Sequence, residues 1–225
     1  MKLLKALSVT LFLMCAVCAP MAAQITFSNS DGTFTDNGGN AIGTSTLSLS
    51  GSTLTDVTGL SMYGVNPTPP AGSSVSFTTG TLATNSITTL GVGQTATFNP
   101  SPSNSFTINY GGGVIFTGSF TGTQSWINSG IAYTFTAQVN GTLYVPGYNP
   151  VTIMGATVQL TTLNDTWTGN TIQDGINNIN GTTFTLPAGG LSPVPEPGTL
   201  SLLGSGLVGL GFFVRRFGIG RTSVK

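Results

Sequence analysis

Apolar and polar residues alternate along most of the middle of the chain with a period of two. The alternation is clearest at residues 106–110, 131–139 and 157–161, where every second residue is apolar and, apart from Ala132, Thr, Asn or Gln fills the positions between. Side chains of a β-strand point alternately to its two faces, so this pattern predicts strands with one buried and one hydrated face. The abundant Thr, Val, Ile and aromatic residues also suit a pleated sheet.

Short segments rich in Gly and Asn separate these runs. Asp31-Gly32 and Asn140-Gly141 are examples of pairs that tolerate the positive φ of tight hairpins, and the second pair predicts a hairpin between two alternating runs. Many short strands at such spacing indicate an antiparallel architecture. We therefore expect residues 24–186 to form an all-β domain, specifically an antiparallel β-sandwich of the jelly-roll kind.

The N-terminal end of the chain differs from this body. Lys2 and Lys5 precede an apolar stretch at residues 7–17, and small residues follow it. A basic region, a short apolar stretch and small residues are, in this order, the features of a secretory signal peptide. We predict that residues 1–23 are a signal peptide and that cleavage before Gln24 releases the body into an exported location.

A second apolar stretch lies near the C-terminal end. Residues 187–193 form a linker of Pro, Gly and Ser, residues 199–214 are apolar and uncharged, and the basic end at residues 215–225 contains Arg215 and Arg216. A helix of about sixteen residues is about 24 Å long, against about 30 Å for a hydrocarbon core. We expect a short transmembrane helix whose basic end stays in the cytoplasm, so that the body lies outside.

A short motif precedes the apolar stretch of this tail, which spans residues 194–225. The motif is Val194-Pro195-Glu196-Pro197. Pro-Glu-Pro, a short apolar helix and an Arg pair, in this order at the C-terminus, resemble the PEP-CTERM sorting signal of Gram-negative and related bacteria. The resemblance covers about residues 194–217.

This resemblance implies a processing partner and a route. It implies that an exosortase, a membrane-embedded cysteine transpeptidase, cuts near Pro-Glu-Pro and removes the hydrophobic tail, much as the tail of a GPI signal is lost. The protein would first be anchored by its C-terminal helix and would then reach the cell surface or the extracellular space. The same tail is also known as an ice-binding-protein C-terminal domain, a name that transfers no activity to the body.

Positive charge is confined to the two ends of the chain. Between Ala6 and Val214 there is no Lys, Arg or His, and both cysteines, Cys15 and Cys18, lie in the N-terminal apolar stretch. Nucleic acid is excluded as a partner because phosphates need cations to neutralise them. Catalysis by Ser-His-Asp, by Cys-His or by a Schiff-base lysine is excluded for want of the residues, and so is a zinc site built on His or Cys. We therefore expect no enzymatic activity.

The acidic residues of the body leave two further possibilities. Two carboxylates suffice for a glycoside hydrolase, which is one alternative function, and carboxylates with carbonyls suit calcium. Turn formation accounts for most of these residues, so we expect no cofactor, with calcium as the ion that would fit best. The residues concerned are Asp31, Asp36, Asp56, Asp165 and Asp174.

Two tryptophans are candidates for stacking on sugar rings. Trp126 stands between apolar residues of predicted strands, where core packing is the simpler interpretation, whereas Trp167 stands in a polar run and is the better candidate for exposure. Ice binding by the Thr-rich strands is another alternative, but the regular repeats that such surfaces need are missing.

These patterns favour an exported, non-enzymatic protein of the cell surface or extracellular matrix. Its expected partners are an exosortase, the membrane through the C-terminal helix, and exopolysaccharide. A carbohydrate-binding module is an alternative that requires an exposed aromatic ring, and a hydrolase would require two aspartates converging in a cleft.

Overall fold

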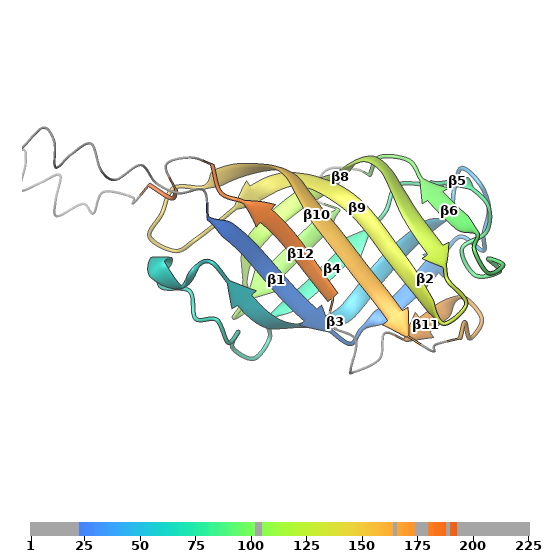
Figure 1. Cartoon of the computed structure of the whole chain (residues 1–225), viewed down its shortest axis with the longest axis horizontal. Helices are drawn as coiled ribbons and strands as arrows, with labels where there is room; N and C mark the ends of the chain where they lie inside the picture. Colours follow the sequence, from blue (N-terminus) through green and yellow to red (C-terminus); the bar gives the residue numbers. More distant parts are fainter. Residues whose placement is uncertain (1–22, 102–104, 164–165, 174–179, 188–189, 193–225) are drawn as a thin grey trace, which may run out of the picture. The chain divides into compact units, whose positions relative to one another are not determined.

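A computed structural model of the chain describes residues 23–101, 105–163, 166–173, 180–187 and 190–192. The chain divides into two compact units, Met1–Ser192 and Pro193–Lys225, and all of the described residues belong to the first. Within that unit, twelve strands join in a single antiparallel sheet (Figure 1). The elements are β1 (Gln24–Ser30), β2 (Thr33–Asn37), β3 (Thr46–Thr58), the 3₁₀ helix η1 (Ser61–Tyr63), β4 (Ser74–Thr78), β5 (Leu82–Thr84), β6 (Thr95–Phe98), β7 (Phe106–Tyr110), β8 (Gly113–Asn128), β9 (Ala132–Leu143), β10 (Val151–Leu163), β11 (Thr171–Gln173) and β12 (Asn180–Thr185).

The first strand closes this sheet into a barrel. β1 pairs with β12 on one side, where Gln24 lies opposite Thr185, and with β3 on the other, where Phe27 lies opposite Val57. The closed path runs β1-β12-β10-β9-β8-β7-β4-β3 and back to β1, a barrel of eight strands. The predicted all-β antiparallel class is confirmed. The predicted β-sandwich is corrected to a barrel, because one sheet closes on itself and the edges of a sandwich are absent from this path.

The longest strands change partners along their length. β1 and β2 lie in succession along β3, and the break between them falls at Asp31 (φ 61°) and Gly32 (φ 110°). The predicted turn at this pair is therefore a bend between two strands that share one neighbour. Similarly, β8 pairs with β7 near Gly118 and with β6 near Ser125. These extensions carry β2, β11, β5 and β6 beyond the eight-stranded ring.

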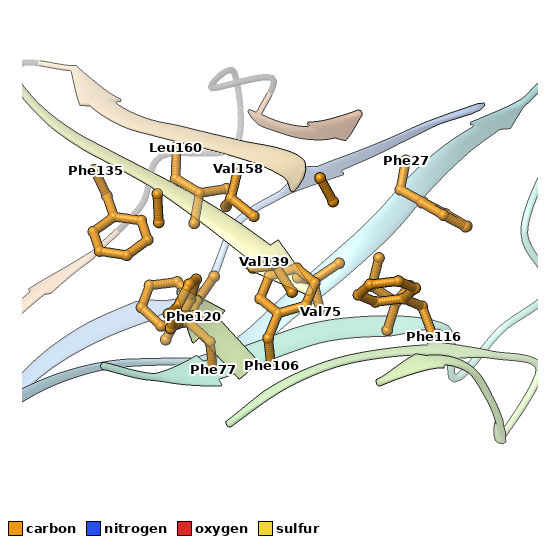
Figure 2. Close-up of a cluster of buried hydrophobic side chains, with 14 of the residues drawn as sticks. Phe27, Val75, Phe77, Phe106, Phe116, Phe120, Phe135, Val139, Val158 and Leu160 are labelled. Atoms are coloured by element: carbon orange, nitrogen blue, oxygen red, sulfur yellow. The ribbon is translucent and has the colours of Figure 1, made fainter. Parts of the chain in front are cut away.

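Aromatic rings fill the interior of the barrel (Figure 2). The Phe77 ring lies 4.7 Å from Phe135 and 5.4 Å from Phe120, measured between centroids, and Phe116 lies 5.4 Å from Phe184. Eight strands enclose a space that side chains just fill, and each buried aromatic side chain removes about 150–250 Å² from water. The interior is thus a packed core, and its residues come from the apolar positions of the alternating runs.

Asn140 and Gly141 lie inside β9, so the hairpin predicted there is wrong. Gly141 pairs with Gly118 of β8. A Cβ atom on Gly141 would lie 2.3 Å from the Thr117 carbonyl oxygen and 2.7 Å from Cζ of Phe116. The glycine is required here because a neighbouring strand and a core ring come close, and positive φ plays no part.

The C-terminal end of the described residues is held against the barrel. Leu191 is buried with the core residues, and the Asn149 N–H donates to the Ser192 carbonyl at 2.9 Å. Residues 1–22 of the predicted signal peptide and the helix predicted at 199–214 lie outside the described residues. Across the described ranges, none of the helical structure has the length and apolar character needed to cross a membrane.

Substitution of Gly141 tests the close strand contact. Gly141→Ala is expected to lower the free energy of unfolding by about 1–3 kcal/mol, because the added methyl forces β8 and β9 apart. Gly181→Ala in β12 is the matched control, since its Cβ would lie 3.4 Å from the Phe27 carbonyl oxygen, near ordinary contact. Urea denaturation of both variants measures the difference. Equal midpoints would contradict the tight packing described for Gly141.

Candidate functional site

Trp126 of β8 belongs to the core. Its side chain is 0% exposed, its ring is stacked on Tyr133 with centroids 5.4 Å apart, and Phe34 lies 5.1 Å away. The ring therefore presents no face to a sugar. Its indole N–H is buried without a hydrogen-bond partner among the described residues, so packing holds it in place.

Trp167 closes the same aromatic cluster from the segment before β11. It is partly buried against the core, and its ring stands edge-on to Trp126 and to Tyr133, with both centroids 6.3 Å away. Its indole nitrogen is also buried, with no partner in the described part of the chain. Most of this ring is used for packing, and a sugar contact at Trp167 stays a prediction.

Asp36 has a structural task in the loop that follows β2. The side chain is 1% exposed, and its Oδ2 accepts a hydrogen bond from the Asn40 N–H at 2.8 Å. Asn40 in turn accepts bonds from the Ser86 hydroxyl and the Ile87 N–H, which ties the loop to the segment before β6. Burial raises the pKa of the Asp36 carboxyl, while hydrogen bonds from Asn40 and Ser45 oppose that rise.

The described aspartates that were predicted to suit calcium or hydrolysis lie on different elements. Within the described ranges, no three His, Cys, Asp or Glu residues lie close enough to hold a metal ion together. Asp31 lies at the bend between β1 and β2, and Asp56 lies on β3. Asp165 and Asp174 lie outside the described residues.

A groove of about 560 Å³ opens at the other end of the barrel. Trp126 lies near the end of β8, whereas the groove is formed around the start of that strand, at Gly113 and Val114. Its walls come from η1, the β7–β8 hairpin and the connection between β9 and β10. We call it the tyrosine groove, because four tyrosines dominate its lining: Tyr63, Tyr110, Tyr144 and Tyr148.

Glycines with positive φ stand beside tyrosines in these connections. Gly64 (φ 80°) ends η1 beside Tyr63, and Gly147 (φ 84°) precedes Tyr148. The rings of Tyr63 and Tyr148 meet edge to face with centroids 5.2 Å apart. The Tyr110 hydroxyl donates to the Asn66 carbonyl at 3.0 Å, so that ring too is held in one orientation. Three of the four tyrosine side chains are thus in contact with neighbouring groups.

The lining decides what the groove can do. Its volume is within the range of about 300–1,000 Å³ that is usual for ligand sites, and such sites are mostly apolar with a few polar groups. Tyrosine supplies both, a ring face and a hydroxyl. No Lys, Arg, His, Asp or Glu occurs among the described residues that line it. The groove suits an uncharged ligand and offers no conventional acid–base pair.

Sequence reasoning missed this site. The signal available was that Tyr63, Tyr110 and Tyr148 each stand beside glycine and that Pro146 and Pro150 flank Tyr148. Tyrosines at turns are placed at strand ends, but nothing local in the sequence says that three separate connections meet at one end of a barrel.

Comparison with known protein families identifies the tail. A family model described as the PEP-CTERM protein-sorting motif matches residues 193–216. The chain carries a PEP-CTERM sorting motif. This motif marks an exported protein that is sorted to the cell surface, and it implies processing by an exosortase. No curated protein and no solved structure matches the chain.

The motif residues fall in the matched range but outside the described structure. Val194, Pro195, Glu196 and Pro197 lie at its start, and Arg215 and Arg216 lie at its end. The PEP-CTERM motif therefore concerns where the protein is sent.

The buried carboxyl of Asp36 predicts a pH dependence of stability. Its pKa in the folded state is raised above the ordinary value of 3.8. Between pH 3.8 and this raised pKa, the folded protein therefore keeps a proton that the unfolded chain has lost. The stabilisation is complete below pH 3.8 and is lost as the pH rises through the folded pKa. The side chain of Asp36→Asn cannot ionise, so this variant does not lose the stabilisation. In the wild type the lost stability amounts to about 1.4 kcal/mol for each unit of pKa shift.

Urea denaturation at pH 3 and pH 7 measures this effect. We compare the difference in unfolding free energy, wild type minus Asp36→Asn, at the two pH values. This difference is expected to be smaller at pH 7 than at pH 3. Asp56→Asn, at a partly exposed position of β3, controls for the removal of a carboxylate in general. A difference that stays constant or rises with pH would contradict the burial argument.

Proposed function

We propose that this protein is an exported, non-enzymatic component of the cell surface or extracellular matrix. The observation that carries the proposal is the combination of a PEP-CTERM motif at residues 193–216 with a body that has no Lys, Arg, His or Cys. The motif supplies the destination. The composition removes Cys and Lys as nucleophiles, His as a general base, and His and Cys as metal ligands.

The proposed route uses both ends of the chain. The signal peptide at residues 1–23 starts export, and the apolar helix at 199–214 anchors the protein with Arg215 and Arg216 in the cytoplasm. Exosortase then cuts near Pro-Glu-Pro and removes the anchor. The barrel is left at the surface or in the matrix, where exopolysaccharide becomes its partner.

The fold is compatible with an extracellular location. A closed path of strands leaves few unpaired edges, which protects against edge-to-edge aggregation where chaperones are scarce. A body of this size buries enough apolar surface to fold without disulfides, in agreement with the lack of cysteine after residue 18.

Carbohydrate binding is the second candidate function, and one observation favours it. The tyrosine groove gathers four aromatic side chains with hydroxyl groups at one end of the barrel. Trp126, by contrast, is fully buried.

Intact-mass measurement of the protein from its native host tests the proposed route. The expected mass corresponds to a chain that begins at Gln24 and ends near Pro197, because both end segments are removed. Glu196→Ala in the motif is expected to retain residues 200–225. Arg221→Ala, in the tail but outside the matched residues, is expected to be processed as the wild type. A wild-type mass that includes residues 200–225 would refute processing at the motif.

A further inference from the structure

The tyrosine groove continues onto the outer face of the barrel. It shares Val114 and Tyr144 with a second hollow of about 460 Å³, which Thr107 and Thr117 also line. This hollow shares Thr107 with a third of about 370 Å³ over β3, β4 and β7. We call the second and third hollows the hydroxyl track, because of their side chains: Thr107, Thr117, Ser48, Ser50, Ser76, Thr78 and Ser105.

The junction between the groove and the track is accessible. Tyr144 is 39% exposed and Val114 is 49% exposed, although both are apolar or aromatic. Two large apolar side chains therefore face solvent at the point where a ring-lined groove meets a row of hydroxyls. An elongated partner could contact rings at one end and hydroxyls at the other.

Charge selects the chemistry of that partner. The body has no Lys, Arg or His, so an anionic polymer would find no counter-charge. The described lining of the groove and the track contains no carboxylate either, so a cationic partner gains nothing. Complementarity therefore points to an uncharged partner.

The pairing of the strands argues against a peptide. Extended peptides commonly bind by adding a strand to an open sheet edge. β4 pairs with β3 and β7, and β8 pairs with β7 and β9, so the strands beneath the track use both of their edges. A partner at the track therefore meets side chains and no open sheet edge. Serine and threonine hydroxyls both donate and accept hydrogen bonds, which matches a ligand covered with hydroxyl groups.

We propose that the tyrosine groove and the hydroxyl track bind a linear, uncharged polysaccharide. The apolar faces of its pyranose rings stack on Tyr63, Tyr144 and Tyr148, and its hydroxyls bond to the track. The proposal rests on the proposed function, since it names the polymer class that the exported barrel contacts. Tyr144 is the central contact, because it belongs to both the groove and the track.

Calorimetric titration of the complete mature protein, from Gln24 to near Pro197, tests this assignment. The probes are the hexasaccharides of cellulose, laminarin, amylose and mannan, with an alginate hexasaccharide as the anionic comparison. At least one neutral probe is expected to bind saturably, and alginate is not. Tyr144→Ala is expected to weaken binding about tenfold or more, as for a central aromatic contact. Tyr144→Phe keeps the aromatic ring and is expected to lose less affinity than Tyr144→Ala.

Ile131→Ala is the matched control. Ile131 is also an exposed apolar residue, at 70%, but it lies in the β8–β9 turn at the other end of the barrel. Its removal is expected to leave binding unchanged. Circular dichroism and the urea midpoint of each variant establish that it is folded, which Tyr144→Ala should be because the Tyr144 backbone N–H keeps its bond to the Ile115 carbonyl.

Several results would overturn the proposal. They are binding of none of the four neutral probes, equal binding of alginate, and affinity for a neutral probe that is the same in Tyr144→Ala as in wild type. Binding of a proline-rich peptide in their place, or Tyr144-dependent dimerisation in sedimentation, would assign the surface to another partner. Correct processing without sugar binding defeats this inference alone, whereas sugar binding by a protein that retains its tail defeats only the proposed route.

Discussion

The pairing of β1 with both β12 and β3 is the constraint on which the rest of the structure depends. It joins residues at the two ends of the body, since Gln24 lies opposite Thr185. Only this pairing closes the meandering sheet into a barrel narrow enough for aromatic side chains such as Phe77 and Phe135 to fill it. Contacts between such distant parts of the chain form slowly, because the loop between them must close first. Closure therefore has to await nearly the whole body, and it also brings the connections that carry the tyrosines to one end.

The interaction that we propose for this barrel does not depend on charge. The body contains no Lys, Arg or His, so hydroxyl and amide groups supply most of its polar side chains. The sorting signal and the proposed binding surface lie in different segments of the chain. The PEP-CTERM motif at residues 193–216 concerns sorting, whereas Tyr63, Tyr144 and Tyr148 line the groove that we propose as the binding surface of the barrel.

The sequence was informative where structure is local. A period of two fixes which residues point inward whatever the sheet does next, so the buried positions of β7 and β10, such as Ile108 and Val158, could be predicted. Closure could not, because the same alternation serves a sandwich and a barrel. Asn140-Gly141 has the composition of a turn, yet Gly141 is required by the Phe116 ring. The tyrosine groove depends on three connections meeting in space, which no local pattern encodes.

Amide hydrogen exchange in β1 tests the closed barrel most directly. Successive N–H groups of a strand point to opposite neighbours, so a strand held on both sides has all of its amides protected. The account predicts comparable slow exchange for all five amides from Ile25 to Asn29, which point alternately toward β12 and β3. Fast exchange at every second residue would show that β1 has an open edge, as in a sandwich, and would contradict the closed barrel.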